Sequence, residues 1–564
     1  MPGIAIKPAR PTAAHARRRS AAPVAPIRRS ARVALLQLSL EARIVWGAVL
    51  AFIGASLAWL TSDHRIPDWD SGIHELLAVS VHNELAAGRL SAPFTDYNSY
   101  PPLVHLVGGL TVFLTGAHPM ALILSSNVVF VPLLAFGCYG TAKLAFGRSA
   151  GLLAALLALG SPMVISTMHQ YQLDAPQAAL VAVAVWALFA SQRLEDTRMA
   201  ALAGAAAGLA LLTKETSVVF LAGPVVVTAL RGRSNRHGVL AFAATCCVLA
   251  GPWYAYHAGE LRSTFETIGG WSADPLRAPP RFSLDSLSWY GWDLVNEQVL
   301  LPFTLAFIAG VALAARRLIR RATPRTSFEP ELLAGALVSY AGMTMLVHKD
   351  PRYTLPMLVF VAVLATGWIA AIARRPLRLA LGAAVVLCAS AYVVGISTPL
   401  GGTLRLSLPG ARAAPLDQNQ LAVYETAGWI RGTPASDGDI PSLLGGLHRM
   451  GIRTLMLYTG PDPVNFNREG LTVAAEASGL SVGQWSAVRP DQVATLILSP
   501  PGPNRPPACR RLDDGSRVYV ALGVTVEIAH GVSGAIDPAT LRALGLPRLR
   551  DTLICPGRAP LVYP

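Results

Sequence analysis

Long apolar runs separated by short polar stretches are the main pattern of this sequence. A transmembrane helix needs roughly 20 mostly apolar residues, and most of the runs approach that length. The runs at 199–213 and 217–230 are the shortest. The pattern predicts about eleven membrane spans, at 44–61, 119–142, 149–166, 175–191, 199–213, 217–230, 238–254, 299–315, 331–347, 353–373 and 379–396.

A twelfth apolar stretch, "YPPLVHLVGGLTVFLTG" at 100–116, decides the topology. Cytoplasmic loops of membrane proteins carry an excess of Lys and Arg. If 100–116 lies in the interface, every later basic block falls on the cytoplasmic side, and if it spans, every block falls outside. The stretch is short and opens with two prolines, so we predict an interfacial helix. The blocks are Lys143/Arg148, Arg193/Arg198, Arg231/Arg233/Arg236, Arg316/Arg317/Arg320/Arg321 and Arg374/Arg375/Arg378.

This topology places the N-terminus in the cytoplasm and the polar part after 397 outside. It also places four shorter segments on the outer face: 62–118, the turn around Asp174, the loop 255–298 and the turn 348–353. The first outer loop is rich in carboxylates, and the turn "HKDPRY" is cationic. The outer face is therefore expected to carry an acidic element and a separate basic element.

Composition supports a multi-pass protein of the cell (inner) membrane. The 564 residues are 52% hydrophobic and only 14% charged, whereas soluble domains have about 25% charged residues. The net charge of +14 does not indicate nucleic-acid binding, because the basic residues lie between apolar runs. Residues 1–42 are rich in Arg, Ala and Pro, which is typical of a flexible basic arm near membrane lipids.

The predicted domains are the arm at 1–42, a polytopic α-helical transmembrane domain at 43–396, and an extracytoplasmic α/β domain at 397–564. In the last part, Pro, Gly and charged residues increase, and four β-rich runs appear at 452–460, 493–501, 517–523 and 524–529. A helical stretch at 440–451 precedes them. Cys509 and Cys555 lie in this part, and an extracytoplasmic location would permit a disulfide between them.

Three carboxylates are candidates for chemistry on the outer face. Asp68 and Asp70 stand in "DWDSGIHE", just before a predicted amphipathic helix. Either could cap that helix, because Asp is a favoured N-cap, and either could act as a general base. Asp174, in "HQYQLDAP", lies at the outer end of the third span. An ionisable residue at that depth indicates function more than structure.

The cationic candidates lie in two places. Lys214 and Glu215, in "LLTKETS", either pair with each other or line a cavity. The turn "HKDPRY" supplies His348, Lys349, Arg352 and Tyr353. Positive charge is normally kept off the outer side, and Arg and Lys are the usual ligands of phosphate. We therefore expect this turn to bind an anion such as a lipid-linked phosphate.

In their order along the chain, these motifs resemble the GT-C membrane glycosyltransferases. Within that superfamily the chain is similar to bacterial relatives of the dolichyl-phosphate-mannose protein mannosyltransferases and of the lipid A aminoarabinose transferase. The resemblance covers about residues 44–375. It rests on the acidic motif after the first span, "YPPL" from Tyr100, "QLDAP", "GLALLTK" and "PRYTLP".

The resemblance implies a GT-C fold and transfer of a hexose or pentose from a polyprenyl-phosphate-linked donor, with inversion, on the outer face. The acceptor is a protein, a lipid or a glycan. Asp70 would be the base, although the family motif usually reads Asp-Glu and here Ser71 follows Asp70, so Asp68 stays an alternative. Asp174 would orient the acceptor, and the cations of 348–353 would stabilise the leaving phosphate. His74, Tyr100, Lys214 and Glu215 would line the cavity.

Other functions give different expectations. A transporter or flippase would carry charges near mid-membrane and inverted repeats, whereas these candidates gather at one face. A non-catalytic membrane protein presenting its C-terminal domain would tolerate Asn at Asp70 and Asp174. An oligosaccharide transferase would need a larger outer loop than 255–298. No Cys/His spacing indicates a metal centre, and two acids at 68 and 70 are only weak support for a divalent cation.

Overall fold

The computed structural model describes residues 39–95, 100–232, 236–263, 279–280, 282–324, 326–346, 348–408 and 420–426. After 426 it describes 444–445, 448, 454–459, 468–482, 493–499, 509–510, 517–521, 524–530 and 554–555. The chain divides after Arg43 into two units. Almost all of the first unit lies outside the described residues, as do the predicted arm at 1–42 and most of the predicted helix at 440–451.

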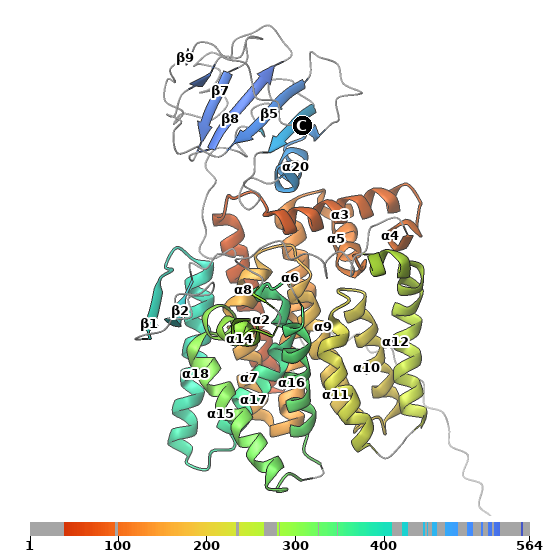
Figure 1. The fold of residues 1–564 in the computed structure, drawn as a ribbon, viewed down its shortest axis with the longest axis vertical. Helices are drawn as coiled ribbons and strands as arrows, with labels where there is room; N and C mark the ends of the chain where they lie inside the picture. Colours follow the sequence, from red (N-terminus) through yellow and green to blue (C-terminus); the bar gives the residue numbers. More distant parts are fainter. Residues whose placement is uncertain are drawn as a thin grey trace, which may run out of the picture. The chain divides into compact units, whose positions relative to one another are not determined.

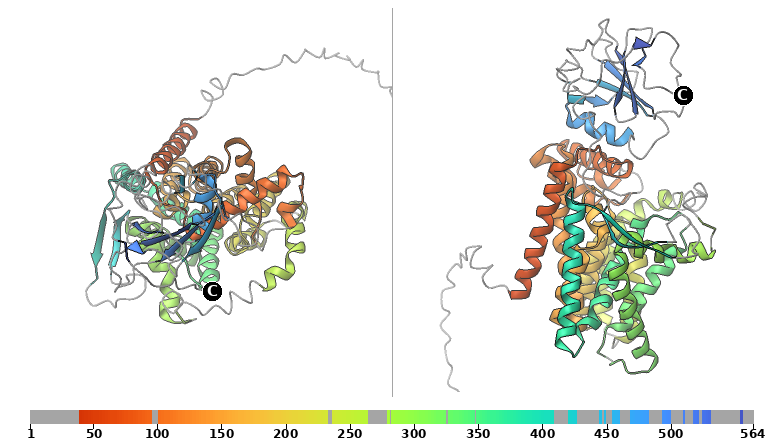
Figure 2. Two further views of the ribbon diagram at one scale, coloured as in Figure 1. Left: turned by 90° about the horizontal axis from the view of Figure 1, so that it is seen from above. Right: turned by 90° about the vertical axis from the view of Figure 1, so that its left-hand side faces the viewer.

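The described residues from 40 to 397 are almost entirely helical, as the apolar pattern predicts. Figure 1 shows the long helices running side by side, with α3 lying across their ends, and Figure 2 gives two further views. The helices are α2 (Leu40–Ser62), α3 (Trp69–Ala86), α4 (Ala92–Thr95), α5 (Leu103–Thr115), α6 (Pro119–Phe146), α7 (Arg148–Leu159), α8 (Pro162–Met168), α9 (Asp174–Ala190), α10 (Thr197–Leu211), α11 (Ser217–Arg231), α12 (Arg236–Tyr256), α14 (Leu284–Asp293), the π-helix η1 (Leu294–Gln298), α15 (Leu300–Ile319), α16 (Glu329–Thr344), the 3-10 helix η2 (Pro351–Met357), α17 (Leu358–Ala370) and α18 (Arg375–Ser397).

Each of the eleven predicted spans coincides with a helix or a pair of helices. In the described part, six helical segments are long and apolar enough to cross a membrane, and the pair α7 and α8 makes a seventh. These two helices meet at a 54° bend. Gly160, Ser161 and Pro162 lie at this break, and the proline has no backbone N–H with which to continue the hydrogen bonds of the preceding helix. Helices α9, α10 and α11 are apolar but shorter. The molecule is a multi-pass membrane protein.

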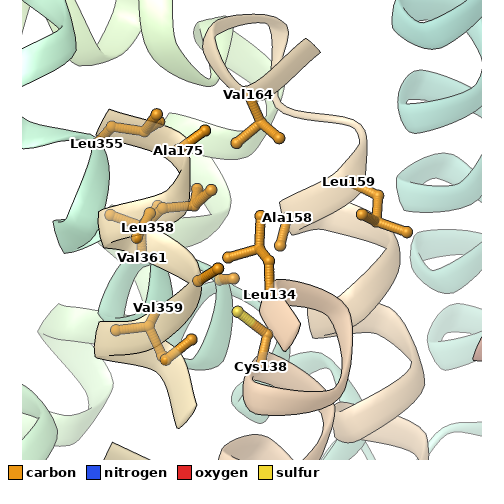
Figure 3. Close-up of a cluster of buried hydrophobic side chains, with 14 of the residues drawn as sticks. Leu134, Cys138, Ala158, Leu159, Val164, Ala175, Leu355, Leu358, Val359 and Val361 are labelled. Atoms are coloured by element: carbon orange, nitrogen blue, oxygen red, sulfur yellow. The ribbon is translucent and has the colours of Figure 1, made fainter. Parts of the chain in front are cut away.

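The buried core of the bundle surrounds η2 and α17. Almost every residue of α17 is buried, and it packs against α6, α7, α9, α15, α16 and α18. Alanine-rich α7 and α9 let these helices approach closely, which is the usual way helices pack in a membrane. Figure 3 shows part of this core, with Leu134, Cys138, Ala158, Val164, Ala175, Leu355, Leu358, Val359 and Val361. This packing fixes η2 at one end of the bundle.

Helix α3 packs against α5 through its small and polar residues. Ser71, His74, Glu75, Ala78 and Val81 are buried, whereas the apolar residues Ile73, Leu76 and Leu77 are only half-buried. The buried positions recur every three or four residues, and α3 packs against α5. A Cβ at Gly108 of α5 would lie 2.7 Å from Ala78. This packing leaves the apolar residues of α3 partly exposed, which is compatible with the predicted helix lying on a membrane.

The part after α18 contains the predicted strands. The structure has β3 (Thr454–Thr459), β4 (Ser481–Val482), β5 (Val493–Ser499), β6 (Cys509–Arg510), β7 (Arg517–Ala521), β8 (Val524–His530), β9 (Ile554–Cys555) and helix α20 (Arg468–Ala477). Five strands form one sheet in the order β4-β3-β5-β8-β7, in which β3 is parallel to β4 and β5, and β8 is antiparallel to β5 and β7. The four predicted β-rich runs correspond to β3, β5, β7 and β8. This confirms the α/β class.

Cys509 and Cys555 lie on neighbouring parallel strands, where Cys509 pairs with Ile554 and Arg510 with Cys555. Their disulfide stays a prediction.

A hairpin that the sequence pattern did not reveal precedes the sheet. It consists of β1 (Thr403–Ser407) and β2 (Gln420–Glu425). The Asn296 side chain in η1 accepts from the Ala422 backbone N–H at 2.9 Å, and the Tyr392 hydroxyl donates to the Val423 carbonyl at 2.8 Å. These bonds attach the hairpin to the bundle.

Candidate active site

Asp68 and Asp70 have different places at the start of α3. Asp68 is the N-cap: its backbone is extended, and its Oδ1 accepts from the Ser71 backbone N–H at 2.8 Å. Asp70 lies one position inside the helix, where its side chain is free of the capping role and points to other elements. The sequence left both residues open for both roles, and the structure separates them geometrically.

Arg352, in η2, connects Asp70 to the cationic turn. Its Nη1 donates to Asp70 Oδ2 at 2.8 Å and to Gln172 Oε1 at 2.5 Å. Its Nε and Nη2 donate to the two oxygens of Asp350, each at 3.0 Å. The Arg352 backbone N–H also bonds to Asp350, which caps η2. One guanidinium therefore joins the acidic and the basic motif, which are 282 residues apart.

The charge of Arg352 dominates the ionisation of Asp70. Burial acts to raise the pKa of the Asp70 carboxyl, but attraction to Arg352, and then to His74 and Lys214, overcomes it and lowers the pKa to about 2. The Asp70 side chain is nevertheless 25% exposed, against 12% for Arg352. Asp70 is thus a carboxylate at neutral pH, and a substrate can reach it.

Lys214 and Asp174 form a second ion pair beside the first. The Lys214 ammonium lies 2.7 Å from Asp174 Oδ1 and 4.7 Å from the centre of the Tyr353 ring, a cation–π distance. Burial acts to lower the pKa of Lys214, but attraction to Asp174 outweighs it and raises the pKa. Lys214 therefore pairs across 40 residues with Asp174 rather than with Glu215, its neighbour in the chain, which is half-buried.

His74 and Tyr100 also lie at this site, with a histidine that the sequence analysis did not single out. His74 Nε2 is 3.6 Å from Asp70 Oδ1, and His74 Nδ1 is 3.0 Å from Nε2 of His105 in α5. The Tyr100 ring meets the His74 ring edge-on, with centroids 5.0 Å apart. Burial lowers the pKa of His74, and attraction to Asp70 opposes that shift. The only sequence signal for His105 is a single polar residue in the apolar run "LVHLVGG".

The other residues of the cationic turn have separate contacts. The Lys349 side chain is buried, and its Nζ donates to the carbonyls of Thr344 at 2.8 Å and Leu346 at 3.2 Å, at the end of α16. The His348 ring lies 5.9 Å from the ring of Tyr353. Of the four predicted residues of the turn, Arg352 therefore contacts the acidic motif directly, Tyr353 lies beside Lys214, His348 lies beside Tyr353, and Lys349 is directed into the fold.

Three residues that the sequence analysis did not propose hold the Arg352 turn in place. Asp350 binds the guanidinium, and Gln172 accepts from it. Gln298, from η1, donates to the Pro351 carbonyl at 2.7 Å and to the Thr354 hydroxyl. The signals were present but weak, because Asp350 and Gln172 each stand inside a quoted motif, "HKDPRY" and "HQYQLDAP".

Together, Asp70, Asp174, Asp350, Lys214 and Arg352 form what we call the site cluster, with three carboxylates and two cations. A carboxylate that can accept a proton lies beside two cations that can bind an anion, which suits attack by a hydroxyl on a sugar phosphate. In the part of the chain that the structure describes, no three His, Cys, Asp or Glu residues are grouped as a metal site would require.

Comparison with known proteins supports this picture at the level of the fold. Residues 99–256 match the family described as dolichyl-phosphate-mannose-protein mannosyltransferase. Two crystal structures of ArnT from Cupriavidus metallidurans, one bound to undecaprenyl phosphate and one apo, are each 16% identical with a TM-score of 0.54. Each alignment covers 86% of this chain and 98% of the ArnT chain. No curated protein matches the sequence significantly.

Proposed function

We propose, from the GT-C membrane-glycosyltransferase fold of this chain, that it transfers a monosaccharide from a polyprenyl-phosphate-linked donor to an acceptor hydroxyl, with inversion. The observation that carries the proposal is the contact between Arg352 and Asp70, which joins an anion-binding group to a proton acceptor. The family match, and the undecaprenyl phosphate in one ArnT structure, support a polyprenyl phosphate as the lipid. The sugar is a hexose or a pentose, and the acceptor a protein, lipid or glycan.

Asp70 is the proposed general base. It is the most exposed carboxylate of the site cluster, at 25%, whereas the side chains of Asp174 and Asp350 are 3% and 10% exposed. Asp68 has its oxygen engaged in capping α3. The acceptor hydroxyl would lose its proton to Asp70 as it attacks the anomeric carbon. Asp174, which is buried, would hold Lys214 and help to orient the acceptor.

Arg352 and Lys214 are the proposed ligands of the donor phosphate. A pKa of about 2 makes Asp70 a weak base while Arg352 is bound to it. A donor phosphate that draws the guanidinium away would weaken this attraction, so the basicity of Asp70 would rise when the donor is in place. His348 and Tyr353 would border the phosphate, with Tyr100 and Glu215 at the cavity wall. Lys349 would stabilise the turn through its hydrogen bonds to the Thr344 and Leu346 carbonyls.

We further propose that the site faces the extracytoplasmic side of the inner membrane. Helices α9, α11 and α16 each have one end near the site cluster. At their other ends lie charged residues: Arg193 just after α9, Arg231 at the end of α11 and Glu331 in the first turn of α16. The positive-inside rule then places the N-terminus in the cytoplasm and the C-terminal domain outside. A reporter after residue 400 should label from outside, and cytoplasmic labelling would overturn this orientation.

A transfer assay tests the function. The purified protein in liposomes is given a panel of undecaprenyl-phosphate-linked hexoses and pentoses, with membrane extract as the source of acceptor. Asp70→Asn should reduce the transfer rate by about 10³-fold, within the range for loss of a general base. The matched control is Asp68→Asn, which keeps a capping oxygen and should stay within about threefold of the wild type. Full activity in Asp70→Asn would remove Asp70 as the base.

A further inference from the structure

A line of buried rings leads away from Asp70. His74 lies 3.6 Å from the carboxylate, and His105 lies 3.0 Å beyond His74. Both histidines are buried, at 2% and 3% exposure. When two neutral imidazoles form a hydrogen bond, one ring donates and the other accepts. The tautomer of His105 therefore determines the tautomer of His74.

The contact between the two rings allows two arrangements of the proton. The nitrogens His74 Nδ1 and His105 Nε2 are 3.0 Å apart, so one of them donates and the other accepts. If His105 donated, His74 would carry its proton on Nε2 and would direct it at the Asp70 carboxylate. If His74 donates with Nδ1–H, its remaining nitrogen, Nε2, carries a lone pair directed at Asp70.

The gap between His74 and Asp70 favours the second arrangement. A charge-assisted N–H···O⁻ bond is usually about 2.7–2.9 Å long, whereas His74 Nε2 and Asp70 Oδ1 are 3.6 Å apart. Two acceptors that share no proton are expected at such a distance. A proton that arrived on Asp70 would have an acceptor directly behind it, already oriented.

We propose that His74 takes over the acceptor's proton from Asp70, and that His105 is a positioning residue that keeps His74 in the tautomer able to do so. This inference rests on the proposed function and extends it. The acceptor O–H bond breaks and its oxygen bonds to the anomeric carbon, while the carbon–phosphate oxygen bond breaks and the phosphate leaves with the electron pair. The proton moves from Asp70 Oδ1 to His74 Nε2.

The surroundings of His74 suit a temporary imidazolium. Asp70 lies on its own helix, Asp174 attracts it from α9, and Lys214 and Arg352 repel it from the loop before α11 and from η2. The neutral ring of His105 faces it from α5 and Tyr100 covers its edge. The proton can leave to the phosphate product, a monoester whose second pKa is near 6, so His74 is neutral again for the next turnover.

Steady-state kinetics of three variants test the role of the two rings. His105→Leu removes the acceptor for His74 Nδ1–H and should lower kcat by about 10- to 100-fold with an unchanged donor KM. His105→Gln carries an amide oxygen near the position of Nε2, and should restore most of that loss. His82→Leu, two turns along α3 and packed on Phe113, is the matched control. Equal loss in His105→Leu and His105→Gln, or no loss in either, would overturn the proposal.

The pH dependence gives a readout that a purely structural role would not move. Protonated His74 cannot accept a second proton, so the wild-type rate should fall as the pH drops through the lowered pKa of His74, below 6.5. In the free enzyme Asp70 stays ionised over that range, because its pKa is about 2, so this limb is to be read from kcat/KM, which reports the free enzyme. His74→Gln should have a lower kcat and lose this acid limb, and an unchanged limb in His74→Gln would contradict the proposal.

A spectroscopic measurement needs no substrate, so its result is independent of the proposed transfer. In protein labelled with 15N-histidine at neutral pH, the signals lost in His74→Gln should show protonated Nδ1 and unprotonated Nε2. They should change in His105→Leu. An Nε2-protonated ring or an imidazolium at His74 would refute the tautomer assignment even if the wild type is an active transferase. Correct tautomers without any transfer would instead count against the proposed function.

Discussion

The bundle carries an ion-pair cluster at each end, and the two clusters are built differently. At the end opposite the site, Glu331 is fully buried and receives Arg193 Nε on one oxygen at 2.8 Å and Arg231 Nη1 on the other at 3.4 Å. Arg317 pairs with Glu329 nearby. We call this group the Arg–Glu cluster. It has three cations and two carboxylates, whereas the site cluster has two cations and three carboxylates.

The difference supports the proposal that the site cluster, and not the Arg–Glu cluster, does the chemistry. Both oxygens of Glu331 are occupied by protein, and Arg193 also donates to the Ser327 carbonyl and stacks on Phe328. Acids in the first turn of α16 are also favoured by its dipole. In the site cluster, the Asp70 side chain is partly exposed, and His74 Nε2 lies 3.6 Å from its Oδ1. The first arrangement holds helices together, and the second leaves a reactive group accessible.

After Asp70→Asn, the largest loss of transfer is expected for Arg352→Gln. It removes the guanidinium that we assign to the donor phosphate, and loss of one such group typically costs about 10²–10³-fold in rate. Because it also leaves Asp350 buried without its cation, the double variant Arg352→Gln/Asp350→Asn is the control. Melting temperature should recover in the double variant and transfer should not. Recovery of both would make Arg352 a structural residue only.

Glu331→Gln should give the next largest effect, on stability rather than transfer. Removing one partner of a buried ion pair costs about 3 kcal/mol, so thermal unfolding in detergent should shift down clearly. Transfer per folded molecule should stay near the wild-type value. Arg317→Gln removes a pair whose Arg is 39% exposed, and should shift unfolding much less, by about 0.5 kcal/mol. A large loss of kcat in Glu331→Gln would abolish the contrast between the two clusters.

A smaller effect is expected for Asp350→Asn. Asp350 holds the Nε and Nη2 groups of Arg352, so an amide in its place keeps one acceptor but no charge. Arg352 should then be less well placed for the donor, and kcat/KM should fall about tenfold, the range of one lost charge-assisted hydrogen bond. Gln172→Leu removes a neutral acceptor from the same guanidinium and should cost less. The reverse order would contradict the assigned positioning role of Asp350.

Lys349→Met should have the smallest effect on transfer. Its Nζ bonds two carbonyls at the end of α16, so the change should cost about 1 kcal/mol of stability. Binding of undecaprenyl phosphate, followed as a thermal shift, should stay within threefold of the wild type. Strong loss of lipid binding in Lys349→Met would restore Lys349 to the phosphate site that its sequence position suggested.

The sequence predicted the helices better than the contacts between them. Apolar length and turn residues are local, so all eleven predicted apolar segments are helical and the four β-rich runs are strands. Asp68 and Asp70 could not be distinguished, because either residue type fits a helix start and the choice depends on where Arg352 lies. The Lys214–Asp174 pair crosses 40 residues, and the sequence offered only the adjacent Glu215 as a partner for Lys214. His105 lies in an apolar run, where no periodicity marks a polar residue that faces another histidine.

The anomeric configuration of the product tests the central claim most directly. A single displacement, in which Asp70 takes the acceptor proton and Arg352 faces the departing phosphate, inverts the anomeric carbon. NMR of the glycoside formed by the wild-type protein from an undecaprenyl-phosphate-linked donor of known configuration should therefore show the opposite configuration. Retention of configuration would exclude a single inverting displacement and would contradict the account.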